Sequence, residues 1–511
     1  MAGVWTGESS GLGGLTQWDV LAGWAAAQPH RPAVVDAESG VSLTFRELAD
    51  AAERVAQALG RLGLRPGERV GFWSDNCPEA VVLLYAAARA GLVWAPINAR
   101  LTPPEARRQA ALSRVRLLLL DPPHHALWTR PGDGALAVMP VVLDSSSPQT
   151  LAWTDLLAAV PGLAAPTAPP PGATAGLLYT SGTTGAPKGA RHTHRTLLGW
   201  CFGMVLAAGW TAGDRILLPY PLFHMGGVGF LVAAHLTGAT VLLLRRPDPN
   251  RLDAAASRFR ATALVAVPTV LSALFRSRAD QLSTLGWPSL TKVATTSGPL
   301  FADTRRAIAT TWPHAALTGL YSATEAFFSA LGPDDQAARP DSVGRPVLGA
   351  QIRIGEGDPP SRPGLIFTRG MTVFAGYDGK PPHAPDQWFT CQDVGFLDAD
   401  GYLYITDRLS DLINSGGEKI ASQEVERVLA RHPAVNEAAV IGRPDPHWGE
   451  RVHAVVSLKP GHHVDPEDLR LWCRAHLAAF KVPKTLEIVP DIPKTATGKI
   501  AKQVLRRRPE R

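Results

Sequence analysis

The stretch Tyr179-Thr-Ser-Gly-Thr-Thr-Gly-Ala-Pro-Lys188-Gly189 decides the fold. The apolar run 176–179 enters it directly and is typical of a buried strand. Glycines let backbone N–H groups approach phosphate oxygens, while hydroxyl groups and one lysine add donors and positive charge. A Walker A loop is excluded, because Lys188 is followed by Gly189 and not by Ser or Thr. We therefore predict a phosphate-binding loop after a buried strand, made by Thr180, Ser181, Gly182, Thr183, Thr184 and Lys188.

Strand-like and helical segments alternate on both sides of this loop. The range 44–59 opens with Thr44-x-x-Glu47, a capping box, and continues with apolar residues at helical spacing. We expect a second helix at 79–90 and strands at 70–73, 116–120, 239–244, 264–267 and 292–295. Alternation of this kind predicts an α/β fold with parallel-type sheets covered by helices. The Pro- and Ala-rich range 161–174 is expected to be a connector.

A smaller second unit is expected after Arg408. Helical and strand patterns alternate over about 100 residues, which is enough for one small α+β domain. We therefore divide the 511 residues into an N-terminal domain, 1–408, and a C-terminal domain, 409–511. Of the formal net charge of +6, residues 408–511 carry +5, with 18 Lys and Arg against 13 Asp and Glu. A solvated basic surface explains this excess, and so does a phosphate-rich partner such as coenzyme A.

Composition excludes several classes of protein. With 45% hydrophobic and 19% charged residues, the chain is globular and not disordered. Its four cysteines are scattered without a CxxC pair, so they predict neither a disulfide framework nor a zinc cluster. No signal peptide and no apolar run of membrane-spanning length are visible, and we expect a cytoplasmic protein. Basic residues do not follow helices with interleaved aromatics, which disfavours nucleic-acid binding.

Four motifs, in order along nearly the whole chain, resemble the adenylate-forming superfamily of acyl-CoA synthetases, adenylation domains and luciferases. They are the 179–189 loop, Gly319-Leu-Tyr-Ser-Ala-Thr-Glu325, the pair Asp393 and Arg408, and Pro493-Lys-Thr-Ala-Thr-Gly-Lys-Ile500. The resemblance implies a large N-terminal adenylation domain with a small barrel-like subdomain. It also implies a small, mobile C-terminal domain that carries a catalytic lysine. ATP, Mg²⁺ and coenzyme A would be the cofactors.

The resemblance implies a nucleotide site assembled from several motifs. Tyr321 would stack on adenine, Thr324 would contact the α-phosphate, and Glu325 would hold Mg²⁺ together with Thr184. Asp393 and Arg408 would bind the ribose. Gly298 and Pro299, in Ser297-Gly-Pro-Leu300, would form the adenine-side turn. Two departures from the family pattern stand out: Ser322 replaces a glycine, and Cys391-Gln392 replaces Thr-Gly before Asp393.

The same resemblance places the reacting groups. Lys499 would bridge the substrate carboxylate and the α-phosphate, where fixed positive charge offsets the repulsion between two anions. His224 would lie beside the incoming carboxylate, although a structural role for this histidine is the other interpretation. We predict that the catalytic residues are Lys499, Glu325, Thr184 and His224. The predicted acid pocket comprises His224, Met225, Gly226, Gly227, Val228, Gly319, Ser322 and Ala323, of which Met225 and Val228 would equally suit the core.

The C-terminal domain would serve a second half-reaction. Gly416 and Gly417 would line the channel for the pantetheine arm, since glycine is needed where backbone passes close to a ligand. The hinge of the family falls at Ser410, where relatives carry Asp or Lys, and this departure puts efficient domain rotation in question.

We therefore expect an ATP-dependent acid–thiol ligase, an AMP-forming acyl-CoA synthetase. One alternative is an adenylating enzyme that passes acyl-AMP to a carrier protein or partner thiol. A second, a nucleotide-binding module without catalysis, is opposed by the intact Glu325, Asp393, Arg408 and Lys499. The stretch 231–235 has no acidic residue to hold a substrate ammonium group, so we expect an apolar acid without an amino group. The resemblance would allow a homodimer.

Overall fold

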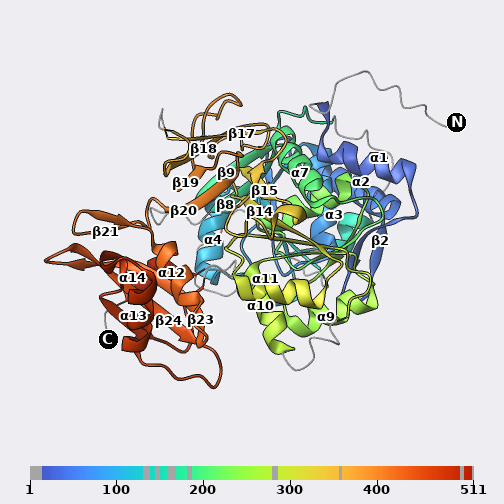
Figure 1. The fold of residues 1–511 in the computed structure, drawn as a ribbon. Helices are drawn as coiled ribbons and strands as arrows, with labels where there is room; N and C mark the ends of the chain where they lie inside the picture. The colour runs from blue at the N-terminus through green and yellow to red at the C-terminus, as the bar shows by residue number, and fades with distance from the viewer. Residues whose placement is uncertain are drawn as a thin grey trace.

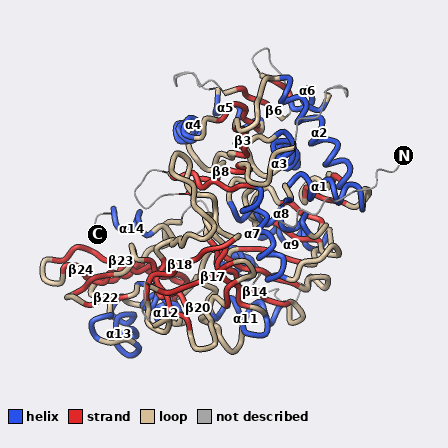
Figure 2. Tube along the Cα trace, turned by 90° about the horizontal axis from the view of Figure 1, so that it is seen from above, coloured by secondary structure: helices blue, strands red, loops and turns tan. Residues whose placement is uncertain are grey.

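The residues that the structure describes form four β-sheets (Figure 1). The structure is a computed structural model that describes residues 14–129, 138–143, 150–158, 168–180, 187–278, 286–355, 359–494 and 500–508. Two large sheets and their helices form the N-terminal body. A smaller antiparallel sheet adjoins this body, and a separate sheet carries the C-terminal residues, as the tube view also shows (Figure 2).

The first large sheet has seven strands in the order β7-β6-β5-β3-β4-β8-β9. All neighbours are parallel except β8 and β9, which form an antiparallel pair. The strands are β3 (Arg69–Trp73), β4 (Val93–Trp94), β5 (Val115–Leu120), β6 (Met139–Val142), β7 (Leu151–Ala152), β8 (Thr174–Thr180) and β9 (Lys188–Thr193).

The second large sheet has nine strands in the order β16-β15-β14-β13-β12-β10-β11-β1-β2. Its centre, from β14 to β1, is parallel, and antiparallel strands close both edges. The strands are β1 (Pro32–Asp36), β2 (Ser42–Thr44), β10 (Arg215–Leu218), β11 (Thr240–Leu243), β12 (Ala263–Ala266), β13 (Lys292–Thr296), β14 (Ala316–Ser322), β15 (Phe327–Leu331) and β16 (Arg345–Pro346).

Helices cover both faces of each large sheet, as expected for parallel strands that are buried on both sides. The largest apolar cluster joins residues of both sheets to α1 (Gln17–Ala27), α2 (Phe45–Arg61), α3 (Pro78–Ala90), α7 (His194–Ala208) and α8 (Met225–Leu236). A second cluster places α9 (Pro249–Arg258), α10 (Pro268–Ser277) and α11 (Ala302–Thr311) against the nine-stranded sheet. A third packs α4 (Pro103–Leu112) and α5 (Pro122–Trp128) against the seven-stranded sheet, and the short α6 (Trp153–Leu157) contacts α2.

Two smaller sheets complete the chain. The four-stranded antiparallel sheet comprises β17 (Ala350–Ile354), β18 (Gly364–Gly370), β19 (Asp393–Leu397) and β20 (Leu403–Arg408). The C-terminal sheet comprises β21 (Ile413–Ser415), β22 (Glu418–Ile420), β23 (Val435–Asp445), β24 (Gly449–Leu458) and β25 (Thr485–Ile488), with α12 (Ser422–Ala430), α13 (Pro466–His476) and α14 (Lys502–Arg507). The four-stranded sheet ends at Arg408, and the C-terminal sheet begins at Ile413. A domain boundary after residue 408 stays a prediction.

The expected elements are present where the structure describes them. Thr44 caps α2 and forms the predicted capping box with Glu47, and the second predicted helix is α3. The predicted strands correspond to β3, β5, β11, β12 and β13. The fold is therefore α/β, as predicted. Part of the predicted connector, 161–167, lies outside the described residues.

Buried histidines make the folded state sensitive to acid. In the core between the large sheets, His235 Nε2 lies 3.0 Å from the Ala33 carbonyl oxygen and Nδ1 lies 2.7 Å from the Tyr85 hydroxyl. Burial lowers the pKa of His235 from 6.5 to about 4. The unfolded chain therefore binds a proton that the folded chain does not, and the stability due to His235 is lost as the pH falls from 6.5 toward 4.

We expect the melting temperature to fall between pH 7 and pH 5, and to fall less in His235→Gln. Glutamine can keep a donor and an acceptor for the same two partners but does not titrate. Thermal unfolding of both proteins at the two pH values measures this. Equal losses in wild type and variant would contradict the assignment to His235.

Candidate active site

Several predicted site residues lie where strands of the two large sheets end. Thr180 ends β8, the turn 297–299 follows β13, and Tyr321 and Ser322 end β14. After β10 the chain runs to His224, which precedes α8. In open α/β sheets ligands bind outside the carboxyl ends of parallel strands, so this edge is the expected position of a site.

Tyr321, Asp393 and Arg408 form one hydrogen-bonded group. The Tyr321 hydroxyl donates to Asp393 Oδ2 at 2.5 Å, and Arg408 Nε donates to Asp393 Oδ1 at 2.9 Å. Asp393 and Arg408 face each other across the β19–β20 pair. One face of the Tyr321 ring is stacked on Phe328, with ring centroids 4.5 Å apart. Three predicted residues from two motifs therefore meet at one place.

Glu325 is buried between β14 and β15, with 9% of its surface exposed. Its Oε1 accepts a 2.8 Å hydrogen bond from the Tyr377 hydroxyl. Burial raises the pKa of Glu325, and the Tyr377 hydrogen bond and the nearby charges of Arg408 and Lys188 oppose that rise. The Lys188 ammonium lies over the Tyr377 ring, 5.6 Å from its centroid. Lys188 and Glu325, which the sequence assigned to separate motifs, are thus close to the same aromatic ring.

A histidine joins the two large sheets beside Glu325. His192 on β9 is 1% exposed, and its Nε2 lies 2.8 Å from the Thr324 carbonyl oxygen. Because a carbonyl only accepts, Nε2 carries the proton and Nδ1 does not. Burial lowers the pKa of His192 to about 4, which keeps the ring neutral. The segment after Lys188 therefore holds the backbone of the Thr324-Glu325 turn.

His224 has a structural role: it caps α8, and its Nδ1 accepts from the Gly226 N–H at 3.2 Å. The space beside the next glycines is filled by protein. A Cβ on Gly226 would lie 2.8 Å from the Tyr220 ring, and one on Gly227 would lie 2.0 Å from the Pro221 carbonyl oxygen. Met225 and Val228 are 2% exposed and belong to the main core cluster. These glycines allow close packing, and their place in an acid pocket stays a prediction.

The remaining predicted pocket residues lie at the end of β14. A Cβ on Gly319 would make ordinary van der Waals contact with the Gln336 side chain, at 3.5 Å. The Ser322 hydroxyl lies 3.4 Å from that of Thr296 on β13, and the Ala323 N–H donates to the Ala326 carbonyl. The chain around Glu325 is a turn between β14 and β15 and does not start a helix.

Two turns of the candidate site carry non-glycine residues with left-handed backbone. Ser297, before Gly298 and Pro299, has φ of 75°, and Gln392 has φ of 64°. Glycine adopts this conformation most readily, so the Cys391-Gln392 departure places a strained residue directly before Asp393. The Leu409 N–H donates to the Gln392 carbonyl, which ties this turn to the end of β20.

Gly416 and Gly417 form the β21–β22 turn, with φ of 62° and 87°. A Cβ on Gly416 would lie 2.8 Å from the Trp448 ring, so this hairpin packs against its own sheet. At the predicted hinge, the Ser410 carbonyl accepts from Arg506 Nη2 at 3.1 Å, and Arg506 also pairs with Asp411 at 2.7 Å. Arg506 of helix α14 therefore contacts the backbone of Ser410 and not its side chain.

Five predicted residues lie outside the described part of the chain: Ser181, Gly182, Thr183, Thr184 and Lys499. Within the described residues, no group of three His, Cys, Asp or Glu side chains could hold a metal ion. Mg²⁺ does not need such a group, because proteins commonly bind it through one or two carboxylates together with substrate phosphates and water. The buried Glu325 carboxylate, with the Lys188 cation nearby, fits that mode of binding.

Sequence reasoning missed two residues of the site, Tyr377 and His192. Lys188, Ala190 and His192 alternate on β9 and share one face, which was a usable signal for His192. Tyr377 stands in a Gly-Tyr-Asp-Gly stretch that is typical of a turn, and its sequence carries no such signal.

The chain is similar to known proteins over nearly its whole length. The model for "AMP-binding enzyme" matches residues 21–378, and that for "AMP-binding enzyme C-terminal domain" matches residues 424–499. A feruloyl-CoA synthase from Amycolatopsis sp is 35% identical over 97% of this chain and 99% of its own length. ATP-bound MatB from Rhodopseudomonas palustris is 29% identical, with a TM-score of 0.85 over 96% of this chain and 98% of its own. The amide bond synthetase McbA from Marinactinospora thermotolerans is 29% identical, with a TM-score of 0.84 over the same shares.

The chain belongs to the AMP-binding enzyme family. It is therefore an enzyme, and the predicted superfamily is confirmed. Among the helices that the structure describes, none is long and apolar enough to cross a membrane.

Proposed function

We propose that the protein is an ATP-dependent acid–coenzyme A ligase. It activates a carboxylic acid as acyl-AMP, releases pyrophosphate, and transfers the acyl group to coenzyme A. The observation that carries the proposal is the hydrogen-bonded group of Tyr321, Asp393 and Arg408, with the buried Glu325 within reach of the Arg408 charge. It occurs in a chain that aligns along 99% of a feruloyl-CoA synthase.

Each residue has a distinct part in the first half-reaction. Tyr321 would present the ring face opposite Phe328 to adenine, and Asp393 and Arg408 would bind the ribose hydroxyls. Lys188 would approach the phosphates from β9, and Thr324 would contact the α-phosphate. Lys499 would bridge the acid and the α-phosphate, where fixed positive charge stabilises the charge that develops during phosphoryl transfer. Mg²⁺, held by Glu325 and Thr184, would supply charge neutralisation on the phosphate oxygens.

The acid is expected to be apolar and without an amino group. Helix α8, which follows His224, is apolar apart from His235, and that side chain is fully buried and bonded to Tyr85 and Ala33. Helix α8 therefore offers no carboxylate for a substrate ammonium group. The feruloyl-CoA synthase relative supports aromatic acids as the first class to test.

The test is pyrophosphate release from ATP with matched acids: ferulate, 4-coumarate, benzoate, octanoate, palmitate and phenylalanine. We expect release with at least one acid that lacks an amino group and none with phenylalanine. Release that depends on phenylalanine would overturn the acid class. Absence of acid-dependent release with every acid would overturn adenylation.

A second candidate is an adenylating enzyme that passes acyl-AMP to another acceptor. Two observations favour it: Ser410 replaces the usual charged hinge residue, and an amide bond synthetase is among the similar structures. It shares the first half-reaction and differs only in the acceptor.

Asp393→Asn should raise the KM for ATP about tenfold or more, because hydrogen bonds to a charged group contribute about 1.5–3 kcal/mol. The variant weakens the bond from Arg408 and removes the charge offered to the ribose. Initial rates at varied ATP, with acid saturating, measure the effect. As a control, Asp398→Asn alters a carboxylate that pairs with Arg339 in the same sheet. An unchanged KM in Asp393→Asn would contradict the ribose assignment.

A further inference from the structure

A short segment connects the phosphate-loop strand to Glu325. We call Ala375–Asp378 the 375–378 strap. It runs along the outer edge of β9: the Ala375 N–H donates to the Arg191 carbonyl, the Arg191 N–H to the Gly376 carbonyl, and the Asp378 N–H to the Gly189 carbonyl. These backbone hydrogen bonds therefore hold the strap against β9, the strand that begins at Lys188.

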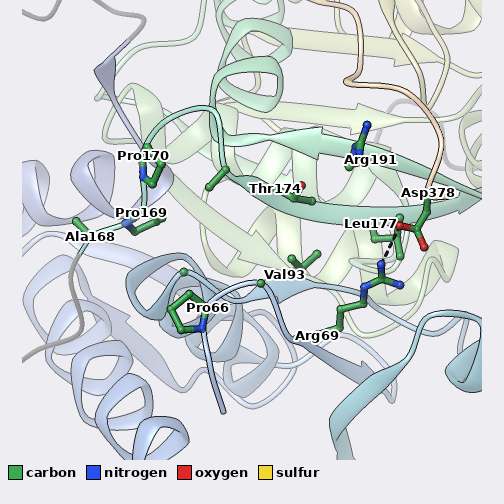
Figure 3. Close-up of a pocket in the computed structure, with 13 residues that line it drawn as sticks. Pro66, Arg69, Val93, Ala168, Pro169, Pro170, Thr174, Leu177, Arg191 and Asp378 are labelled. Atoms are coloured by element: carbon green, nitrogen blue, oxygen red, sulfur yellow. Dashed lines mark hydrogen bonds and ion pairs between the residues drawn. The ribbon is translucent and has the colours of Figure 1, made fainter. Parts of the chain in front are cut away.

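Contacts of two residues anchor the strap: the ion pair of Asp378 at its end, and the ring of Tyr377. Asp378 pairs with Arg69 of β3 at 2.8 Å, at the edge of a cavity of about 470 Å³ (Figure 3). Arg69 also donates to the Ser113 carbonyl, so its guanidinium is held from two sides. The Tyr377 ring packs edge-on against the buried Phe374, with centroids 4.9 Å apart. These contacts leave the Tyr377 side chain little freedom.

Tyr377 touches two of the groups that face the phosphates in the proposed function. Its hydroxyl donates to Glu325 Oε1 at 2.8 Å, and its ring lies under the Lys188 ammonium at 5.6 Å. A hydrogen bond to a buried carboxylate is charge-assisted and directional, so it fixes the orientation of the carboxylate plane. A cation over an aromatic face is held by the ring quadrupole.

We infer that Tyr377 is a positioning residue that sets Glu325 and Lys188 together for a metal-bound nucleotide. The inference rests on the proposed function. Tyr377 acts through these two residues and need not touch the substrate. Its hydroxyl serves Glu325 and its ring serves Lys188, so the two parts can be separated by substitution.

The experiment measures the Kd of the full-length protein for ATP, with Mg²⁺ and with EDTA, by calorimetry. Tyr377→Phe removes only the hydroxyl, and Tyr377→Leu also removes the ring. Tyr404→Phe is the matched control, because its hydroxyl donates to Asp398 in the four-stranded sheet at 3.3 Å. Melting temperatures show that the variants fold.

We expect Tyr377→Phe to weaken binding of ATP with Mg²⁺ about tenfold and to change binding without metal by less than about twofold, since one charge-assisted hydrogen bond is lost. Tyr377→Leu should weaken binding in both conditions. Tyr404→Phe should bind as wild type does. Unchanged binding of ATP with Mg²⁺ in Tyr377→Phe, or equal losses with and without metal, would overturn the inference. A wild type that binds ATP but forms no AMP with any acid would overturn the proposed function alone.

Discussion

Lys499→Ala should slow acid-dependent pyrophosphate release by about 10²–10³-fold or more, the range for losing one preorganised group that stabilises transition-state charge. The acid and the α-phosphate are both anions, and a fixed cation between them has its greatest effect as the new bond forms. The second half-reaction has no such approach of two anions. Transfer from supplied acyl-AMP to coenzyme A should therefore be retained in this variant.

Both half-reactions can be followed separately. Pyrophosphate release reports the first, and consumption of synthetic acyl-AMP with coenzyme A reports the second. Lys494→Ala is the control within the same motif, since Lys494 is already paired with Glu437 at 3.0 Å. If Lys499→Ala released pyrophosphate at the wild-type rate, the proposed role of Lys499 in the first half-reaction would be contradicted.

Glu325→Gln should lower the adenylation rate by about 10²-fold or more, because Mg²⁺, which would neutralise the reacting phosphates, loses its carboxylate ligand. Glutamine has the same shape and can still accept the hydrogen bond from Tyr377. A buried charge is unfavourable, and Glu325 is only 9% exposed. The variant replaces this charge with a neutral group. We therefore expect a melting temperature no lower than that of the wild type.

Loss of activity together with retained stability would show that the Glu325 charge serves chemistry and not folding. Single-turnover pyrophosphate release and thermal unfolding measure the two effects. If the melting temperature fell and the loss of activity matched the loss of folded protein, Glu325 would be a structural carboxylate instead.

Much of the fold could be predicted from local patterns. The capping box at Thr44 and Glu47 predicted the start of α2, and short apolar runs predicted the central strands. These signals depend on neighbours in sequence, which is why they can be read without a structure. The assembly of Tyr321, Asp393 and Arg408 depends on the packing of one sheet against another, and only the family resemblance indicated it.

Other features required the three-dimensional packing. Small residues after His224 predicted room for a ligand, and that stays a prediction; what the structure adds is that a Cβ on Gly226 or Gly227 would meet Tyr220 or Pro221. A sequence shows that a side chain is missing but not what occupies its place. Tyr377 was missed for a related reason: its partners, Lys188 and Glu325, lie far from it in the chain.

Coenzyme A is the proposed acceptor of the acyl group. The direct measurement is mass spectrometry of a reaction that contains the protein, ATP, Mg²⁺, coenzyme A and the acid that supports pyrophosphate release. We predict that acyl-CoA and AMP accumulate in equal amounts, and that both disappear when coenzyme A or the acid is omitted. Formation of acyl-AMP that coenzyme A does not consume would contradict the ligase assignment and leave an adenylating enzyme with another acceptor.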